Sequence, residues 1–110
     1  MKPVYVRAGK VIDEIRDVAR EHGYAVAVHG SLRRERDIDL LAAPWTKNAH
    51  AYSTLVRAVG KLPYLQRPKR DVDHEKPHGR RAAVFLIKHR GKDCPAYVDF
   101  SVMPRAGDRA

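Results

Sequence analysis

The chain has 110 residues, which is enough for one hydrophobic core but too few for a catalytic domain joined to a full substrate-binding domain. Its net charge of +9 favours contact with polyanions without deciding which polyanion. The single cysteine, Cys94, excludes an internal disulfide, and no apolar run is long enough to span a bilayer. We therefore expect one domain over residues 1–110, with its core at about 8–105, in a cytoplasmic protein without a membrane partner; the oligomeric state stays open.

Helix and strand patterns alternate along the first part of the chain. Apolar residues recur at helical spacing over residues 8–22, and Gly23 is placed to end that helix. Residues 24–29 form a short apolar run with β-branched side chains at alternate positions, which predicts a buried strand. The strand leads to Gly30, which permits a tight turn, and to Ser31, which can cap a short helical turn. Backbone amides there can bind an anion, although Gly-Ser alone is typical of an ordinary strand-to-helix turn.

Two aspartates separated by one apolar residue open the second predicted strand, residues 37–43. Because side chains alternate along a strand, Asp37 and Asp39 point to one face. The other face is apolar and consists of Ile38, Leu40 and Ala42. Carboxylates one pleat apart suit a divalent cation, whereas an isolated pair is also consistent with a solvated sheet face.

A second helix follows this strand. Thr46 is a suitable N-cap for an amphipathic segment that ends at Gly60. Trp45 lies between strand and helix, where an aromatic side chain is more often part of the core than a platform for a nucleic-acid base. Residues 62–81 contain several prolines and an excess of basic side chains, which predicts a long, mobile loop.

The end of that loop reads Lys76-Pro77-His78-Gly79-Arg80-Arg81. The guanidinium groups of Arg80 and Arg81 could bind triphosphate oxygens in a bidentate manner, and each residue is equally consistent with a solvated basic turn. His74 and His78 are not expected to form a zinc site, because the segment has neither cysteines nor a helical spacing of histidines.

The last part of the chain predicts a hairpin. Residues 82–89 are typical of a central strand, and the turn at 90–93 joins them to a second strand at 96–103. In that second strand the apolar residues Val98, Phe100 and Val102 share one face, so Asp99 lies on the other. The polar tail at 105–110 is expected to be frayed.

Both acidic strands thus place carboxylates opposite a purely apolar triple. This shared pattern allows Asp37, Asp39 and Asp99 to meet over one face of a sheet. The predicted fold class is α/β: a small mixed sheet with helices on one face and an acidic metal and nucleotide cleft on the other.

The Gly30-Ser31 turn, the Asp37-Ile38-Asp39 strand start and the later Asp99 together resemble the signature of the nucleotidyltransferase superfamily typified by DNA polymerase beta, which includes the minimal nucleotidyltransferases. Residues 36–45, 76–81 and 97–105 look like small nucleotidyltransferase-like proteins encoded by bacteriophages. The resemblance covers roughly residues 24–105, and a phage-encoded protein would act in the host cytoplasm.

The resemblance implies a nucleotidyltransferase fold and transfer of a nucleoside monophosphate from an NTP to an unidentified acceptor hydroxyl, with release of pyrophosphate. It assigns two Mg²⁺ ions, with Mn²⁺ as the alternative, to Asp37, Asp39 and Asp99. It assigns the β- and γ-phosphates to Gly30 and Ser31. Further phosphate ligands would be Arg33, Arg80 or Arg81. The acceptor would be a nucleic acid or a protein.

A second interpretation stays open. The spacer between Gly-Ser and Asp-x-Asp is shorter than is usual in the family, and Arg36 stands where a serine is common. These departures favour a non-catalytic module that binds nucleic acid or a protein partner, including an antitoxin-like role. The three aspartates in matching positions favour catalysis.

Overall fold

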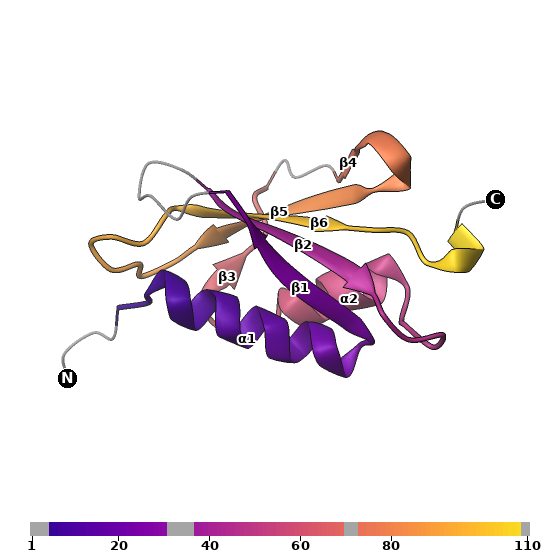
Figure 1. The fold of residues 1–110 in the computed structure, drawn as a ribbon. Coiled ribbons are helices and arrows are strands. Elements are labelled where there is room, and N and C mark those ends of the chain that lie inside the picture. Colours follow the sequence, from indigo (N-terminus) through magenta and orange to yellow (C-terminus); the bar gives the residue numbers. More distant parts are fainter. Residues whose placement is uncertain (1–4, 31–36, 70–72, 109–110) are drawn as a thin grey trace.

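A computed structural model describes residues 5–30, 37–69 and 73–108 of the chain (Figure 1). A six-stranded mixed sheet is covered on one face by two helices, α1 (Ala8–Glu21) and α2 (Tyr52–Val59). The strands are β1 (Tyr24–His29), β2 (Ile38–Pro44), β3 (Leu65–Gln66), β4 (His74–Glu75), β5 (Arg81–Ile87) and β6 (Tyr97–Val102). Short 3₁₀ turns occupy Pro77–Gly79 and Ala106–Asp108. The predicted α/β class with a mixed sheet is confirmed.

The strand order is β1-β2-β6-β5-β3, and β4 also pairs with β5. β2 and β6 run parallel, whereas the other neighbouring pairs are antiparallel. The hairpin of β5 and β6 is as expected from the sequence. β1 pairs only with β2, so it is an edge strand and not the buried strand that its apolar run predicts. Only one of its faces packs on the core, and the other exposes Ala25, Ala27 and His29.

The hydrophobic core lies between the sheet and the helices. α1 contributes Val11, Ile12, Ile15 and Ala19, and α2 contributes Tyr52, Leu55, Val56 and Val59. The sheet contributes alternate residues of its central strands, among them Ile38, Leu40, Ala42, Phe85, Val98, Phe100 and Val102. The apolar triples predicted for the two acidic strands are therefore buried against the helices. The alternate residues of these strands, which include the aspartates, point to the opposite face of the sheet. Cys94 is also buried.

α1 ends where the sequence predicts. Gly23 adopts a φ of +88°, and its N–H donates to the carbonyl of Arg20. A Cβ at this position would lie 2.7 Å from the Cα of Ala49 and 2.7 Å from Oγ1 of Thr46. Glycine is thus required both for the left-handed backbone and for the close approach of the segment that follows β2.

α2 begins at Tyr52 and not at Thr46. The preceding segment is held instead by the end of α1: the Trp45 N–H donates to the Gly23 carbonyl, and the His50 N–H donates to the His22 carbonyl. These tertiary hydrogen bonds keep residues 45–50 from extending the helix. Trp45 is 65% exposed, so the prediction that it fills the core is wrong.

The segment at 62–81 is not one loop. β3 and β4 each pair with β5 through two residues, which is too short to leave a periodic pattern in the sequence. Residues 106–108 of the tail form a 3₁₀ turn, and the Arg105 guanidinium donates to both carboxylate oxygens of Asp108 at 3.0 Å. None of the helices in residues 5–30, 37–69 and 73–108 is long and apolar enough to cross a membrane.

Gly23→Ala should destabilise the fold by about 2–4 kcal/mol, because alanine adds left-handed strain to a backbone clash. Gly9→Ala is the matched control: Gly9 lies exposed in α1 with nothing near its missing Cβ, so alanine should be neutral or stabilise by up to about 1 kcal/mol. Urea denaturation measures both free energies of unfolding. Equal stability of Gly23→Ala and the wild type would contradict the role given to Gly23.

Candidate functional site

Three aspartates lie on the sheet face that carries no helix. Asp39 and Asp99 are direct partners in the parallel pairing of β2 and β6. Asp37 stands two residues before Asp39, immediately ahead of β2, so strand alternation directs it to the same face. On the outer side of this pair, His29 of β1 is the partner of Asp39. The aspartates named from the sequence are thus brought together at the start of the two parallel strands.

Two basic side chains approach the aspartates. The Lys76 Nζ atom lies 3.4 Å from Oδ2 of Asp99, and the His29 Nδ1 atom lies 3.5 Å from Oδ2 of Asp39. The second oxygen of Asp99, Oδ1, is buried and has no hydrogen-bond partner in the described part of the chain. A buried carboxylate oxygen without a partner is costly, and a cation or donor supplied from outside would satisfy it.

The carboxylates influence one another. Partial burial raises the pKa of Asp37 above its ordinary value, and the negative charges of Asp99 and Asp39 raise it further. Both effects disfavour the ionised form of Asp37. The face therefore holds negative charge that the fold only partly compensates.

Among residues 5–30, 37–69 and 73–108, no group of three or more His, Cys, Asp or Glu side chains is arranged to hold a metal ion. The nearest basic partners of Asp39 and Asp99 are His29 and Lys76. The donor set itself suits Mg²⁺, a hard cation that prefers carboxylate oxygens, and the unpartnered Oδ1 of Asp99 is such an oxygen.

Of the residues predicted to bind phosphate, the structure describes Gly30, Arg80 and Arg81. Gly30 follows β1 with a φ of +84°, a left-handed conformation that favours glycine, and it comes directly after His29, the register partner of Asp39. Ser31 and Arg33, also named for the phosphates, lie outside the described residues.

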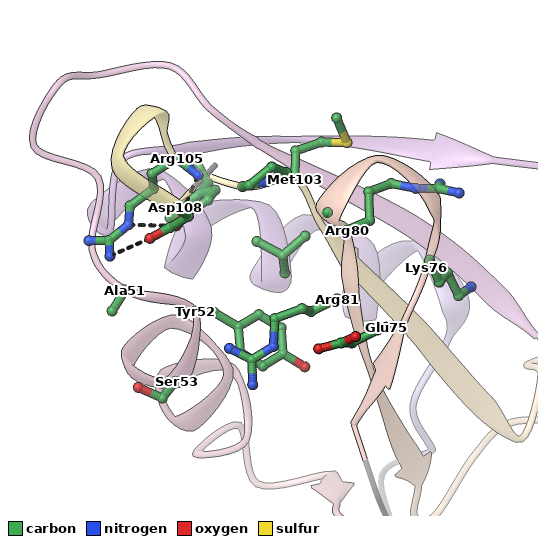
Figure 2. A pocket seen from close by; sticks show the side chains of 14 residues that line it. Ala51, Tyr52, Ser53, Glu75, Lys76, Arg80, Arg81, Met103, Arg105 and Asp108 are labelled. Atoms are coloured by element: carbon green, nitrogen blue, oxygen red, sulfur yellow. Dashed lines mark hydrogen bonds and ion pairs between the residues drawn. The ribbon is translucent and has the colours of Figure 1, made fainter. Parts of the chain in front are cut away.

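Arg80 and Arg81 line a cavity of about 540 Å³ at the far ends of β2 and β6 (Figure 2). The guanidinium carbon of Arg81 lies 4.1 Å from the centre of the Tyr52 ring. Arg81 is also the register partner of Val102, which packs in the core, so it belongs to the helix side of the sheet. Arg80 and Lys76 point away from the Arg81–Tyr52 pair (Figure 2). The structure therefore does not bring Arg81 to the aspartates, whereas Arg80 lies beside the lysine that reaches them.

A tight turn sets the position of Lys76. His78 and Gly79 both have positive φ, of 66° and 75°, and the Lys76 N–H donates to the Arg80 carbonyl at 2.8 Å. The turn directs Lys76 towards β6 and Asp99. Sequence reasoning did not single out Lys76 or His29 as neighbours of the aspartates. His29 could have been found from its place at the end of the strand before Gly30, while the reach of Lys76 depends on the turn and leaves no sequence signal.

No protein-family model matches the chain, and no curated protein matches it in sequence. The candidate site is therefore defined by its aspartates, by the basic side chains near them and by their positions on the sheet.

Asp73 provides a contrast to the clustered aspartates. Burial acts to raise its pKa, but the hydrogen bond from Arg67 and the positive charges of Arg67 and Arg81, with a contribution from Tyr52, together outweigh burial, and the pKa is lowered. Arg67 also forms an ion pair with Asp73 and lies over the Phe85 ring. Asp73 is therefore a structural carboxylate stabilised in its ionised form.

Asp37→Asn and Asp73→Asn should change stability in opposite directions at neutral pH. The ionised Asp37 opposes folding, so asparagine should leave stability equal or higher, and the difference should vanish as the pH falls and Asp37 takes up a proton. Asp73→Asn should lose roughly 1–3 kcal/mol, and this loss should disappear as acid protonates Asp73 below the ordinary aspartate pKa. Urea denaturation across this acidic range measures both. Destabilisation by Asp37→Asn at neutral pH would make Asp37 a structural residue.

Proposed function

We propose that the protein is a magnesium-dependent nucleotidyltransferase, which moves a nucleoside monophosphate from an NTP to an acceptor hydroxyl and releases pyrophosphate. The observation that carries this proposal is the direct pairing of Asp39 with Asp99 across two parallel strands, with Asp37 one pleat before Asp39. Nucleotidyl transfer needs metal ions, neutralisation of phosphate charge and in-line alignment more than it needs a covalent catalyst. A carboxylate cluster with basic side chains beside it would supply those requirements.

In this proposal Asp37, Asp39 and Asp99 hold the metal. Bound Mg²⁺ would neutralise charge on the reacting phosphate and lower the pKa of the acceptor hydroxyl. The Oδ1 atom of Asp99, which is buried without a partner among the described residues, supports this role for Asp99, and the raised pKa of Asp37, which a nearby cation would lower, supports it for Asp37. During the reaction the acceptor oxygen bonds to the α-phosphorus, the bond to the β-phosphate breaks, and the hydroxyl proton is released with pyrophosphate.

Lys76 and Arg80 are assigned to the triphosphate. Lys76 compensates Asp99 in the protein without ligand, with its Nζ 3.4 Å from the carboxylate. A cation on Asp99 would remove the need for that ion pair and leave Lys76 available for phosphate oxygens. Among the described residues Arg80 is held at Nε alone, which donates to the Pro77 carbonyl at 3.3 Å, so its terminal nitrogens could serve the same phosphates. Gly30, which follows β1, lies on the β1 side of the aspartates, whereas Lys76 contacts Asp99 of β6.

A non-catalytic module that binds nucleic acid or a protein partner, including an antitoxin-like role, is the second candidate. Lys76 and His29 favour it, because their contacts with Asp99 and Asp39 compensate the carboxylates without metal. The two candidates differ in what a metal does. Mg²⁺ with NTP should raise the melting temperature of the enzyme, and it should leave the melting temperature of the module unchanged.

Asp39→Asn and Asp99→Asn should each reduce nucleotidyl transfer at least about 100-fold, because each removes a ligand for the charge that stabilises the reacting phosphate. The assay follows transfer from each α-labelled NTP, with Mg²⁺, to RNA, DNA and host lysate, together with pyrophosphate release. Asp17→Asn is the matched control, since Asp17 is an exposed carboxylate of α1, and it should retain full transfer. Transfer that survives in the Asp39 and Asp99 variants would exclude this active site.

Arg80→Ala should weaken NTP binding by roughly 10-fold, as expected when one charge-assisted hydrogen bond to phosphate is lost. Its melting temperature should stay close to that of the wild type, because the hydrogen bond that the Arg80 side chain makes within the described chain goes to the nearby Pro77 carbonyl. Arg81→Ala should retain NTP affinity and lose some stability, since it removes the contact with Tyr52. Calorimetric titration with NTP and thermal melts measure both effects. Equal loss of NTP affinity in both variants would show that the two arginines serve one ligand.

A further inference from the structure

The cavity beside Arg81 is lined by more cations than anions. Its lining includes Lys76, Arg80, Arg81 and Arg105, together with Glu75 and Asp108 (Figure 2). Arg105 is fixed by Asp108 and by a hydrogen bond from Nη1 to the Ala49 carbonyl, so that acid is already compensated. The first turn of α2 also opens onto the cavity and has no side-chain cap. The cavity therefore offers donors and positive charge to an anion.

Arg81 is the most accessible of these cations for an incoming ligand. It is exposed, and its guanidinium carbon lies over the Tyr52 ring, 4.1 Å from the ring centre. No ion pair of Arg81 occurs within the described residues. A guanidinium held by an aromatic ring keeps its N–H groups for a phosphate.

A second basic hollow adjoins the cavity. Its volume is about 350 Å³, and its lining includes Arg16, Arg20, Tyr24 and Trp45. Tyr24 lines both the hollow and the cavity, so the two are neighbours. The Trp45 indole is 65% exposed at this end of the molecule. Arginines interleaved with an exposed aromatic ring are typical of surfaces that bind single-stranded nucleic acid.

We propose that these two hollows, with Arg16, Arg20, Trp45 and Arg81 at their centre, form a binding surface for single-stranded nucleic acid, here called the terminal surface. Its arginines would contact successive backbone phosphates, and an unpaired base would stack on Trp45. The base of a duplex is already stacked between its neighbours, so the exposed indole selects single strands. The surface reaches towards Asp99 through Lys76, which lines the cavity and contacts that aspartate.

In the proposed enzyme the terminal surface would bind the acceptor, which would then be a single-stranded nucleic acid. In that respect alone the terminal surface rests on the proposed function. The binding site itself requires neither NTP nor metal. Its test can therefore be made in EDTA, where nucleotidyl transfer does not occur.

The experiment measures fluorescence anisotropy of a labelled oligoribonucleotide of about eight nucleotides, added to the full chain over a range of salt concentrations. Trp45→Ala should weaken binding roughly 5- to 100-fold, the range expected for loss of one stacked base. Arg81→Gln should weaken binding and reduce the slope of log affinity against log salt by about 0.7, the value for one phosphate contact on a single strand. Because Trp45 is the only tryptophan, its fluorescence should also be quenched by an unlabelled oligonucleotide.

Two control variants lie at the opposite end of the molecule. Tyr5→Ala removes another exposed aromatic ring, and Lys10→Gln removes another exposed positive charge. Both should change the affinity far less than their counterparts. The Trp45 side chain is exposed, and thermal melts of Trp45→Ala and Arg81→Gln should show that each variant remains folded.

Three results would overturn the terminal surface: equal losses in the control variants, equally tight binding of a duplex, or unquenched Trp45 at saturating oligonucleotide. If these occur while the Asp39-dependent transfer assay succeeds on another acceptor, only the terminal surface fails. If binding behaves as expected but no NTP is transferred to any acceptor, the surface stands and the enzyme proposal fails.

Discussion

The parallel pairing of β2 with β6 is the constraint on which the rest of the structure depends. It places two apolar triples side by side under α1 and α2. Because side chains alternate along each strand, the same register sets Asp39 directly beside Asp99 on the opposite face. The core cannot form in this register without bringing the carboxylates together. Hydrophobic burial therefore stabilises an arrangement that electrostatic repulsion alone would oppose.

The fold moderates this repulsion without removing it. Lys76 and His29 each approach one carboxylate, but Asp99 retains a buried oxygen without a partner among the described residues, and the pKa of Asp37 remains raised. A purely structural cluster would gain stability from complete pairing, as Asp73 does with Arg67. Incomplete pairing at Asp37 and Asp99 is expected where an external cation completes the site. This difference between the two kinds of aspartate is the physical basis of the enzyme proposal.

The sequence predicts the elements that carry strong periodic patterns. α1, β2, β5 and β6 all appear close to their expected positions, and so does the common face of Asp39 and Asp99. It does not predict features that depend on distant partners. The start of α2 is set by hydrogen bonds between residues 45–50 and the end of α1. An apolar run such as that of β1 has the same sequence pattern at the edge of a sheet as in its middle, so the pattern does not predict the strand's position. β3 and β4 exist only because β5 offers them a partner.

The basic end of the predicted loop shows why composition alone misleads about a site. Arg80 and Arg81 look equivalent in the sequence, yet Arg81 begins a strand in which alternate residues face opposite sides. Arg81 is held by Tyr52 on the helix side, while Arg80 remains beside Lys76 and the approach to Asp99. In the two proposals, one residue of displacement would separate two anion-binding tasks, with Arg80 assigned to a triphosphate and Arg81 to a nucleic-acid strand. At the start of a strand, two neighbouring side chains point to opposite faces of the sheet, so each can contact a different ligand.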